Sequence, residues 1–218
     1  MSIFDIRLRN RATGQGVLAD ANHRGELITA GGLPRHTEDT RRGDRYATMA
    51  TGAVAALVAR PTTTAALEIY NNTGAVPYKG AACSLVVTRL FSHWLVSSTT
   101  GLGSGAGIYA MVTVPKAAPT DAALAVNSMS GKAALGAAGQ IYTAASATVI
   151  ANGWFPYGRS QVKESAGAVV PMGTLEAEID GRLIVPPGCS LCLHVVSGYT
   201  GDTFTPGAEW LFEPLTLE

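Results

Sequence analysis

Two cysteines near the end of the chain have a spacing that is typical of metal or redox chemistry. Cys189 and Cys192 are separated by two residues, as in a metal knuckle or a redox pair. A structural zinc site needs four ligands, however, and the only other cysteine is Cys83, although His194 is close in sequence. In a strand, side chains three residues apart point to opposite faces. We therefore predict reduced thiols and no bound metal.

The glycine-rich segment 101–107 has the composition of a nucleotide-binding loop. A phosphate-binding loop of that type must open a helix, whereas residues 108–114 have the pattern of a strand. Ser104 also lacks the two flanking glycines of a nucleophile elbow, because Leu102 and Ala106 stand in their places. We interpret the segment as a hairpin connection.

Other candidates for acid–base or metal chemistry are few. Glu176 and Glu178 would share one side of a strand and could bind calcium or act as a glycosidase pair, although hydrated surface charges are the commoner arrangement. No metal-binding spacing occurs among the four histidines, which are His23, His36, His93 and His194. No nucleophile, base and orienting group can be assembled from these residues. We therefore predict a protein that is not an enzyme, with no catalytic residue and no cofactor.

Any site would have to be positioned by short β-strands, which recur along the chain. From Thr174 to Asp180 polar and apolar residues alternate, and Asp180-Gly181 suits a tight hairpin turn. Further strand patterns follow over residues 183–185 and 190–196. These patterns predict an all-β fold, an antiparallel β-sandwich of jelly-roll topology.

Length and composition favour one domain in an assembled state. We expect an extended N-terminal arm over residues 1–16 and a single β-sandwich domain with long loops over residues 17–218. Charged residues make up 15% of the chain, against about 25% in an ordinary soluble domain. Low charge is typical of surfaces that other subunits cover, so we expect a homo-oligomer, a trimer in the first instance. A monomer with small polar loop residues is the alternative.

The longest strand pattern, Cys83–Ser98, has apolar residues at odd and at even positions. Strict alternation would put Val87 and Phe91 on one face and Leu90 and Trp94 on the other. Two apolar faces fit a strand that packs on the core with one side and is covered by a loop or subunit on the other. We therefore expect Trp94 in the core or in a subunit interface.

The first residues combine basic and apolar side chains. Arg7, Arg9 and Arg11 stand at alternate positions, so an extended backbone would present all three on one side. Phe4 and Leu8 would supply an apolar anchor. One interpretation is a solvated face. The other is an interface in which the arginines meet the acidic groups of a neighbouring subunit or of a partner protein's surface.

Charge and hydropathy argue against nucleic-acid and membrane partners. The isoelectric point near 6.9 is far from that of a dedicated nucleic-acid binder, and no run of about 20 mainly apolar residues occurs. The N-terminus lacks the layout of a signal peptide, so we expect synthesis in a cytoplasm. Residues 164–218 hold eight acidic residues and one arginine, whereas residues 1–60 hold nine arginines and six acidic residues. Such opposite ends could dock on neighbouring copies, and the alternative is a fold that interleaves the two ends and cancels the asymmetry.

One stretch resembles a known group of proteins. Residues Ile179–Gly188 read IDGRLIVPPG, and a β run and Glu209-Trp210 follow. This pattern resembles the C-terminal part of virion structural proteins of tailed bacteriophages and of related jelly-roll proteins associated with the capsid. The resemblance implies a β-sandwich that assembles as a trimer or larger ring. Its implied partners are the major capsid protein or other virion proteins, and its implied location is the capsid surface. No active-site residue follows from it.

Two functions from different classes remain as hypotheses. The first is a non-enzymatic virion structural protein, a capsid decoration or cement protein that binds and stabilises the shell. The second is a carbohydrate-binding or host-recognition module of a phage tail or fibre. In that module Trp154, Phe155 and Tyr157 would stack on sugar rings, although a packed loop would also explain such a cluster.

Overall fold

The computed structural model describes most of the chain. Apart from the short strands before residue 30, the described residues are 37–96, 105–120, 126–131, 139–150, 153–162, 173–198 and 201–214. The chain divides into two units, residues 1–38 and 39–218. The division falls after residue 38, whereas the sequence predicts a boundary after residue 16.

The N-terminal unit is built from short antiparallel strands. They are β1 (Arg7–Arg9), β2 (Gly16–Leu18), β3 (Asp20–Ala21) and β4 (Leu27–Ile28). β1 pairs with β2, and β3 pairs with β4. Residues 7–9 of the predicted arm therefore form a strand that pairs with residues 16–18. Phe4 and Arg11 lie outside the described residues.

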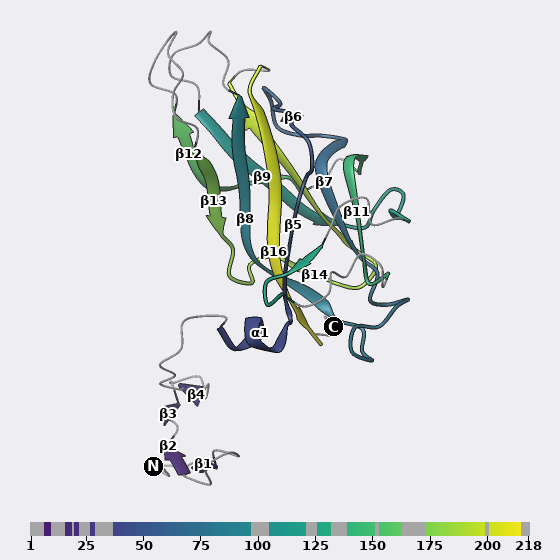
Figure 1. Cartoon of the computed structure of the whole chain (residues 1–218). Coiled ribbons are helices and arrows are strands. Elements are labelled where there is room, and N and C mark those ends of the chain that lie inside the picture. Colours follow the sequence, from purple (N-terminus) through teal and green to yellow (C-terminus); the bar gives the residue numbers. More distant parts are fainter. Residues whose placement is uncertain are drawn as a thin grey trace. The chain divides into compact units, whose positions relative to one another are not determined.

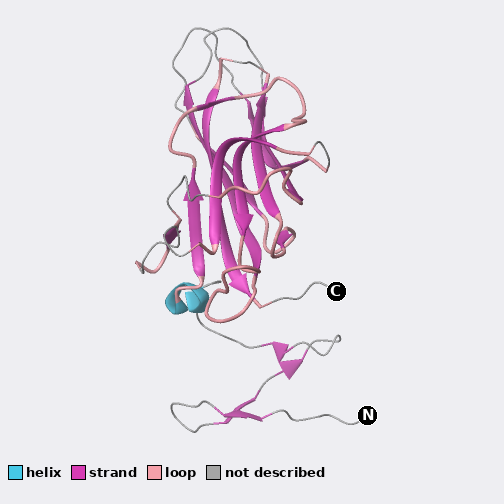
Figure 2. Cartoon of the chain, turned by 90° about the vertical axis from the view of Figure 1, so that its right-hand side faces the viewer, coloured by secondary structure: helices cyan, strands magenta, loops and turns pink. Residues whose placement is uncertain are grey.

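The second unit is an antiparallel β-sandwich, which confirms the predicted fold class (Figure 1 and Figure 2). A short helix, α1 (Thr37–Arg42), leads into its first strand. One sheet has the order β10-β5-β16-β8-β13, with β14 also paired to β8 and β6 to β16. Its strands are β5 (Arg45–Met49), β6 (Val54–Ala55), β8 (Ser84–Val96), β10 (Asn127–Ser128), β13 (Thr174–Glu178), β14 (Ile184–Val185) and β16 (Thr203–Glu213).

The other sheet has five strands in the order β11-β7-β15-β9-β12. They are β7 (Thr64–Asn71), β9 (Gly105–Thr113), β11 (Ile141–Thr148), β12 (Phe155–Val162) and β15 (Ser190–Ser197). Strands that follow one another along the chain mostly fall in opposite sheets, as β7, β8 and β9 do. Neighbouring strands within one sheet are therefore separated in the sequence by strands of the other sheet. The two sheets must form together, and their apolar faces are buried against each other.

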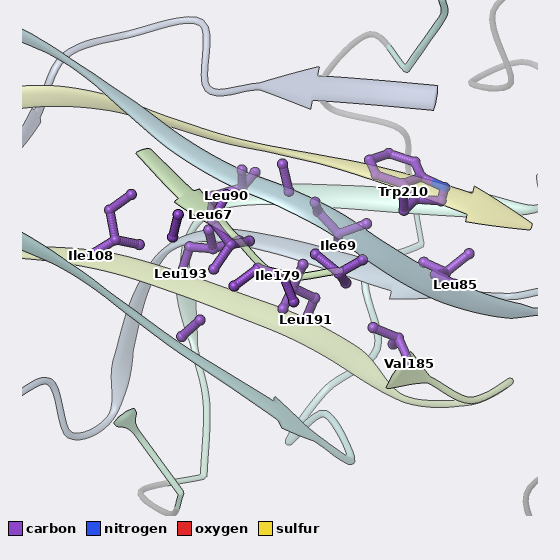
Figure 3. Packing of buried hydrophobic residues seen from close by; sticks show 14 of the residues in the cluster. Leu67, Ile69, Leu85, Leu90, Ile108, Ile179, Val185, Leu191, Leu193 and Trp210 are labelled. Carbon is purple, nitrogen blue, oxygen red and sulfur yellow. The ribbon is translucent and has the colours of Figure 1, made fainter. Parts of the chain in front are cut away.

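Alternate residues of both sheets meet in one core (Figure 3). The five-stranded sheet contributes Leu67, Leu191 and Leu193, and the seven-stranded sheet contributes Leu85 and Trp210. All five side chains are almost fully buried. Burying a side chain of this size stabilises the fold by about 1.5–3 kcal/mol.

A β-bulge at Thr88 changes which residues of β8 face the core. Glu209 of β16 pairs with Arg89 but Trp210 pairs with Val87, so Thr88 is an extra residue in β8. Its hydroxyl donates a hydrogen bond of 3.2 Å to the carbonyl oxygen of Glu209. Val87 before the bulge and Leu90 after it are both buried in the core. The strict alternation predicted for this strand is therefore wrong.

The bulge also settles the position of Trp94. This side chain is 4% exposed and belongs to the core, where its ring stacks on Phe204 with 5.1 Å between ring centroids. Of the two predicted positions, core and subunit interface, the core is the one observed. Apolar residues from both predicted faces of β8 thus converge on one side, and the second apolar face disappears as an argument for assembly.

A buried amide ties the two sheets together where β7 ends. The Asn71 side chain is fully buried, and its Nδ2 donates to the carbonyl oxygens of Cys83 and Val185, at 2.8 Å each. Its Oδ1 accepts from the backbone nitrogen and the hydroxyl of Thr73. Cys83 precedes β8 and Val185 lies in β14, so Asn71 links its own sheet to the other one. All four hydrogen-bonding positions of the amide are filled.

The sandwich is narrow where β12 meets β13. Gly158 has a φ of 76°, and a Cβ atom at this position would lie 2.5 Å from the carbonyl oxygen of Glu176. Only glycine combines this left-handed conformation with such a close approach. β13 is the last strand of its sheet, and its edge therefore lies against the edge strand of the other sheet.

Replacing Trp94 tests the assignment of β8. Trp94→Ala should lower the free energy of unfolding by about 3–5 kcal/mol, because it empties a large volume in a packed core. Phe155→Ala is the matched control, since Phe155 is 62% exposed and its loss should change stability by no more than about 0.5 kcal/mol. Urea unfolding followed by circular dichroism gives both values. Equal stability of Trp94→Ala and wild type would contradict the core assignment.

Candidate interaction surface

Charged residues form a ladder across the outward face of the seven-stranded sheet. Arg45 Nη2 lies 2.6 Å from Glu209 Oε2, and Arg89 Nη1 lies 3.2 Å from Glu209 Oε1. Arg89 Nη2 in turn lies 2.5 Å from Glu176 Oε1. These four residues, here called the charge ladder, come from β5, β16, β8 and β13, so the alternating charges cross four neighbouring strands.

Burial along the charge ladder decreases from the middle of the sheet to its edge. The Glu209 side chain is 7% exposed, whereas that of Glu176 is 50% exposed. Two arginines neutralise Glu209, which offsets the cost of removing its carboxylate from water. Glu176 is in contact with solvent, so the charge ladder ends at β13 in a carboxylate that remains accessible.

Phe91 and Gly207 shape the same face next to the charge ladder. They are a cross-strand pair, and a Cβ atom on Gly207 would lie 2.4 Å from Phe91 Cζ. The ring therefore covers the glycine, and Arg89 lies 5.4 Å from its centroid. An aromatic ring over a strand glycine restores packing that the missing side chain would otherwise lose.

A hollow of about 390 Å³ lies on the same face, further along β5 and β16. The largest apolar side chains that line it are those of Met49 and Leu95, which are 46% and 41% exposed to solvent. Thr205 adds a polar side chain to the lining. Large exposed apolar side chains beside a charged zone are the composition of a surface on which another chain can pack.

The aromatic cluster proposed as a sugar platform is not assembled as one surface. Trp154 is buried, and its indole nitrogen donates a 2.9 Å hydrogen bond to the carbonyl oxygen of Thr62. Phe155 is exposed, whereas Tyr157 packs against the main core. Stacking on a sugar needs exposed rings on one side, so these three residues do not supply the predicted binding surface together.

The three cysteines are free thiols in this structure, and two of them are buried. Burial raises the pKa of Cys192, and burial also raises the pKa of Cys83. Raised pKa values keep the thiols protonated and unreactive. Within the described part of the chain, no three side chains among His, Cys, Asp and Glu gather at a metal-binding distance.

Two titratable groups are buried on the outward face of the five-stranded sheet. Glu68 is almost fully buried, and its Oε1 has no hydrogen-bond partner. Burial raises the pKa of Glu68, and the Ser190 hydroxyl opposes that shift. His194 Nδ1 accepts a 2.9 Å hydrogen bond from the backbone nitrogen of Val195, and burial lowers the pKa of this imidazole. Both groups are therefore favoured in their neutral forms.

Sequence reasoning found some of these residues and missed others. Glu176 was singled out by its alternation, but not as the partner of Arg89. Nothing in the sequence indicated that Arg45 and Glu209 form an ion pair, because they are 164 positions apart. No family model matches the chain, and no curated protein matches it. No helix in the described residues is both long and apolar enough to cross a membrane.

Removing the buried carboxylate of the charge ladder should be costly. Glu209→Ala leaves two partly buried guanidinium groups without their shared partner, and we expect a loss of about 3 kcal/mol in unfolding free energy. Glu176→Ala is the matched control and should cost no more than about 1 kcal/mol, because its side chain is half exposed. Chemical denaturation at one pH measures both. Equal effects of the two substitutions would contradict the observed burial.

Glu68 should make stability depend on pH. Its folded pKa is raised above the unfolded value, so its stabilising contribution is complete below the unfolded pKa and is lost as pH rises through the folded pKa. Within that window the loss has a limiting slope of about 1.4 kcal/mol per pH unit. Glu68→Gln, a neutral substitution of the same size, should abolish this decrease of the unfolding free energy with rising pH, whereas Glu176→Gln should leave it unchanged. Unfolding curves from pH 4 to pH 8 test this, and parallel curves for Glu68→Gln and wild type would refute it.

Proposed function

We propose that this chain is a non-enzymatic structural protein of a virion, a capsid decoration or cement protein that binds and stabilises the shell. It acts on the capsid surface as a homo-oligomer, and the stoichiometry that we propose is a trimer. Its partners are the major capsid protein or other virion proteins, and it makes no direct contact with nucleic acid or membrane. The observation that carries this proposal is the strand order of the sandwich.

The strand order supports a jelly roll. Four strands of one sheet are ordered β5-β16-β8-β13, and four strands of the other are ordered β7-β15-β9-β12. An eight-stranded jelly roll folds as two such sheets, in which successive strands alternate between the layers. The remaining edge strands, β10 and β11, both come from the segment between β9 and β12. Jelly rolls are a recurrent architecture of viral capsid domains and of lectins.

The composition of the outward face of the seven-stranded sheet supports the proposal that the protein acts as an oligomer and not as a monomer. The hollow beside Met49 and Leu95 offers apolar area, and the charge ladder next to it offers fixed charges. Apolar area supplies affinity, whereas charges near a rim set register and association rate. A surface with both properties suits a protein that clamps its neighbours in one orientation.

The alternative is a carbohydrate-binding or host-recognition module. A specific observation in its favour is the 62% exposed ring of Phe155 in an architecture that lectins also use. Against it, Trp154 is buried and Tyr157 packs on the core, so one exposed ring remains of the predicted three. A glycan array separates the alternatives, because the structural protein should bind no glycan whereas the module should bind at least one class. Loss of such binding in Phe155→Ala would establish the second function.

Self-association is the direct test of the proposed function. Sedimentation velocity of the purified chain at micromolar concentration should show a stable oligomer whose mass is a small multiple of 22.5 kDa. A monomer that does not shift on concentration would contradict the proposal.

A further inference from the structure

We infer that the outward face of the seven-stranded sheet binds the same face of a second copy of this chain, about a two-fold axis through the middle of the charge ladder. Arg45 of each copy then meets Glu176 of the other copy. The inference rests on the proposed self-assembly and names the contact that produces it. Two observations support it: the order of the charges along the charge ladder, and the exposure of its two ends.

The charges of the charge ladder alternate in sign from one side of the sheet to the other. Their order is Arg45, Glu209, Arg89 and Glu176. The strands that carry them, β5, β16, β8 and β13, lie side by side in this order (Figure 1). The row therefore begins with a positive group and ends with a negative one. Such a row is complementary to itself when it is turned end to end, because every positive position then faces a negative one.

This charge order selects one orientation of two facing copies. A two-fold axis that lies between the two faces and runs across the row reverses the row, so Arg45 lies over Glu176 and Glu209 lies over Arg89. A two-fold axis along the row would instead place each side chain over its own counterpart, and like charges that face each other are repelled. The selected contact is isologous, since both copies use the same surface.

The two ends of the charge ladder can each bind a second partner. The Glu176 side chain is half exposed and that of Arg45 is 19% exposed. A guanidinium has several N–H donors and a carboxylate has several acceptor positions, so each end can keep its partner within the chain and bind another group. The planar guanidinium fork also gives an arginine–carboxylate pair a defined geometry. The new ion pairs therefore form at the ends, whereas the pair of Glu209 and Arg89 stays within its own chain.

The residues beside the charge ladder allow two such faces to approach. Ala47 of β5 pairs with Glu209 across the strands and is small, and Gly207 of β16 is covered by the ring of Phe91. Sheets that pack face to face lie about 10 Å apart, a gap that an arginine and a glutamate side chain together can bridge. Met49 on the same face loses contact with water in this arrangement. Apolar burial then supplies affinity, because exposed ion pairs contribute little.

The stoichiometry separates this inference from the proposed function. A contact with a two-fold axis joins chains in pairs, so it gives a dimer, or joins two of the proposed trimers into a hexamer. Sedimentation equilibrium should therefore give the mass of an even number of 22.5 kDa chains. An odd number of chains, a lone trimer included, overturns the inference and leaves the proposed function standing. A wild type that remains monomeric overturns both.

Charge reversal at the ends of the charge ladder tests the pairing. E176R should weaken self-association about tenfold in sedimentation velocity, because Arg45 of the other copy then meets a like charge. The matched control K116E reverses an exposed charge after β9 and should associate like the wild type. An equimolar mixture of E176R and R45E should regain association, because each copy offers the charge that the other lacks. Melting temperatures establish that the variants fold. Association of E176R at wild-type strength, or no recovery in a mixture of folded variants, overturns the inference.

Cross-linking identifies the pair and does not depend on the folding of R45E. The variant R45K keeps the positive charge and supplies an amine, which a carbodiimide couples to a carboxylate in contact with it. Mass spectrometry of mixed unlabelled and isotope-labelled chains should show a link from the substituted residue to Glu176 of another copy, and E176Q should abolish it. Lys79 and Asp44, an ion pair within one chain, are the positive control. A Lys79–Asp44 link without the link to Glu176 overturns the inference.

Discussion

The extra residue at Thr88 decides how the two sides of the central sheet are used. Strand pairing has a period of two, so one inserted residue sends every later side chain to the opposite face. Before the bulge Val87 points into the core, and after it Leu90 and Trp94 do. Arg89 is placed on the outward side by the same shift, and there it meets Glu209. Core packing and the charge ladder are thus two consequences of one irregularity in β8.

The two sheets depend on each other because successive strands alternate between them. Asn71 fixes one junction with a fully satisfied set of hydrogen bonds, and Gly158 permits close contact at the opposite edge. Inside this rigid frame the outward face of the seven-stranded sheet carries charge, an aromatic–glycine pair and an apolar hollow. Such a combination is suited to recognition by packing. This is the physical basis for proposing a structural role.

Local patterns were sufficient for the fold class but not for the surface. The strands predicted over residues 190–196 and 83–98 are observed as β15 and β8, because alternation and turn residues act over short distances. The bulge at Thr88 could not be predicted locally, since it depends on pairing with a strand 121 residues away. The same limit applies to Arg45 and Glu209, whose contact is created by the topology. No local signal shows which guanidinium will meet which carboxylate.

The central claim is that the outward face of the seven-stranded sheet is the surface through which the chain assembles. Hydroxyl-radical footprinting read by mass spectrometry tests this at individual side chains, by comparing dilute and assembled protein. Met49 and Leu95 are exposed in the single chain, and Phe155 is the reference because it lies on the other sheet. The account predicts that assembly lowers the oxidation of Met49 and Leu95 several-fold and leaves that of Phe155 unchanged. Equal oxidation of Met49 in both states would contradict the account.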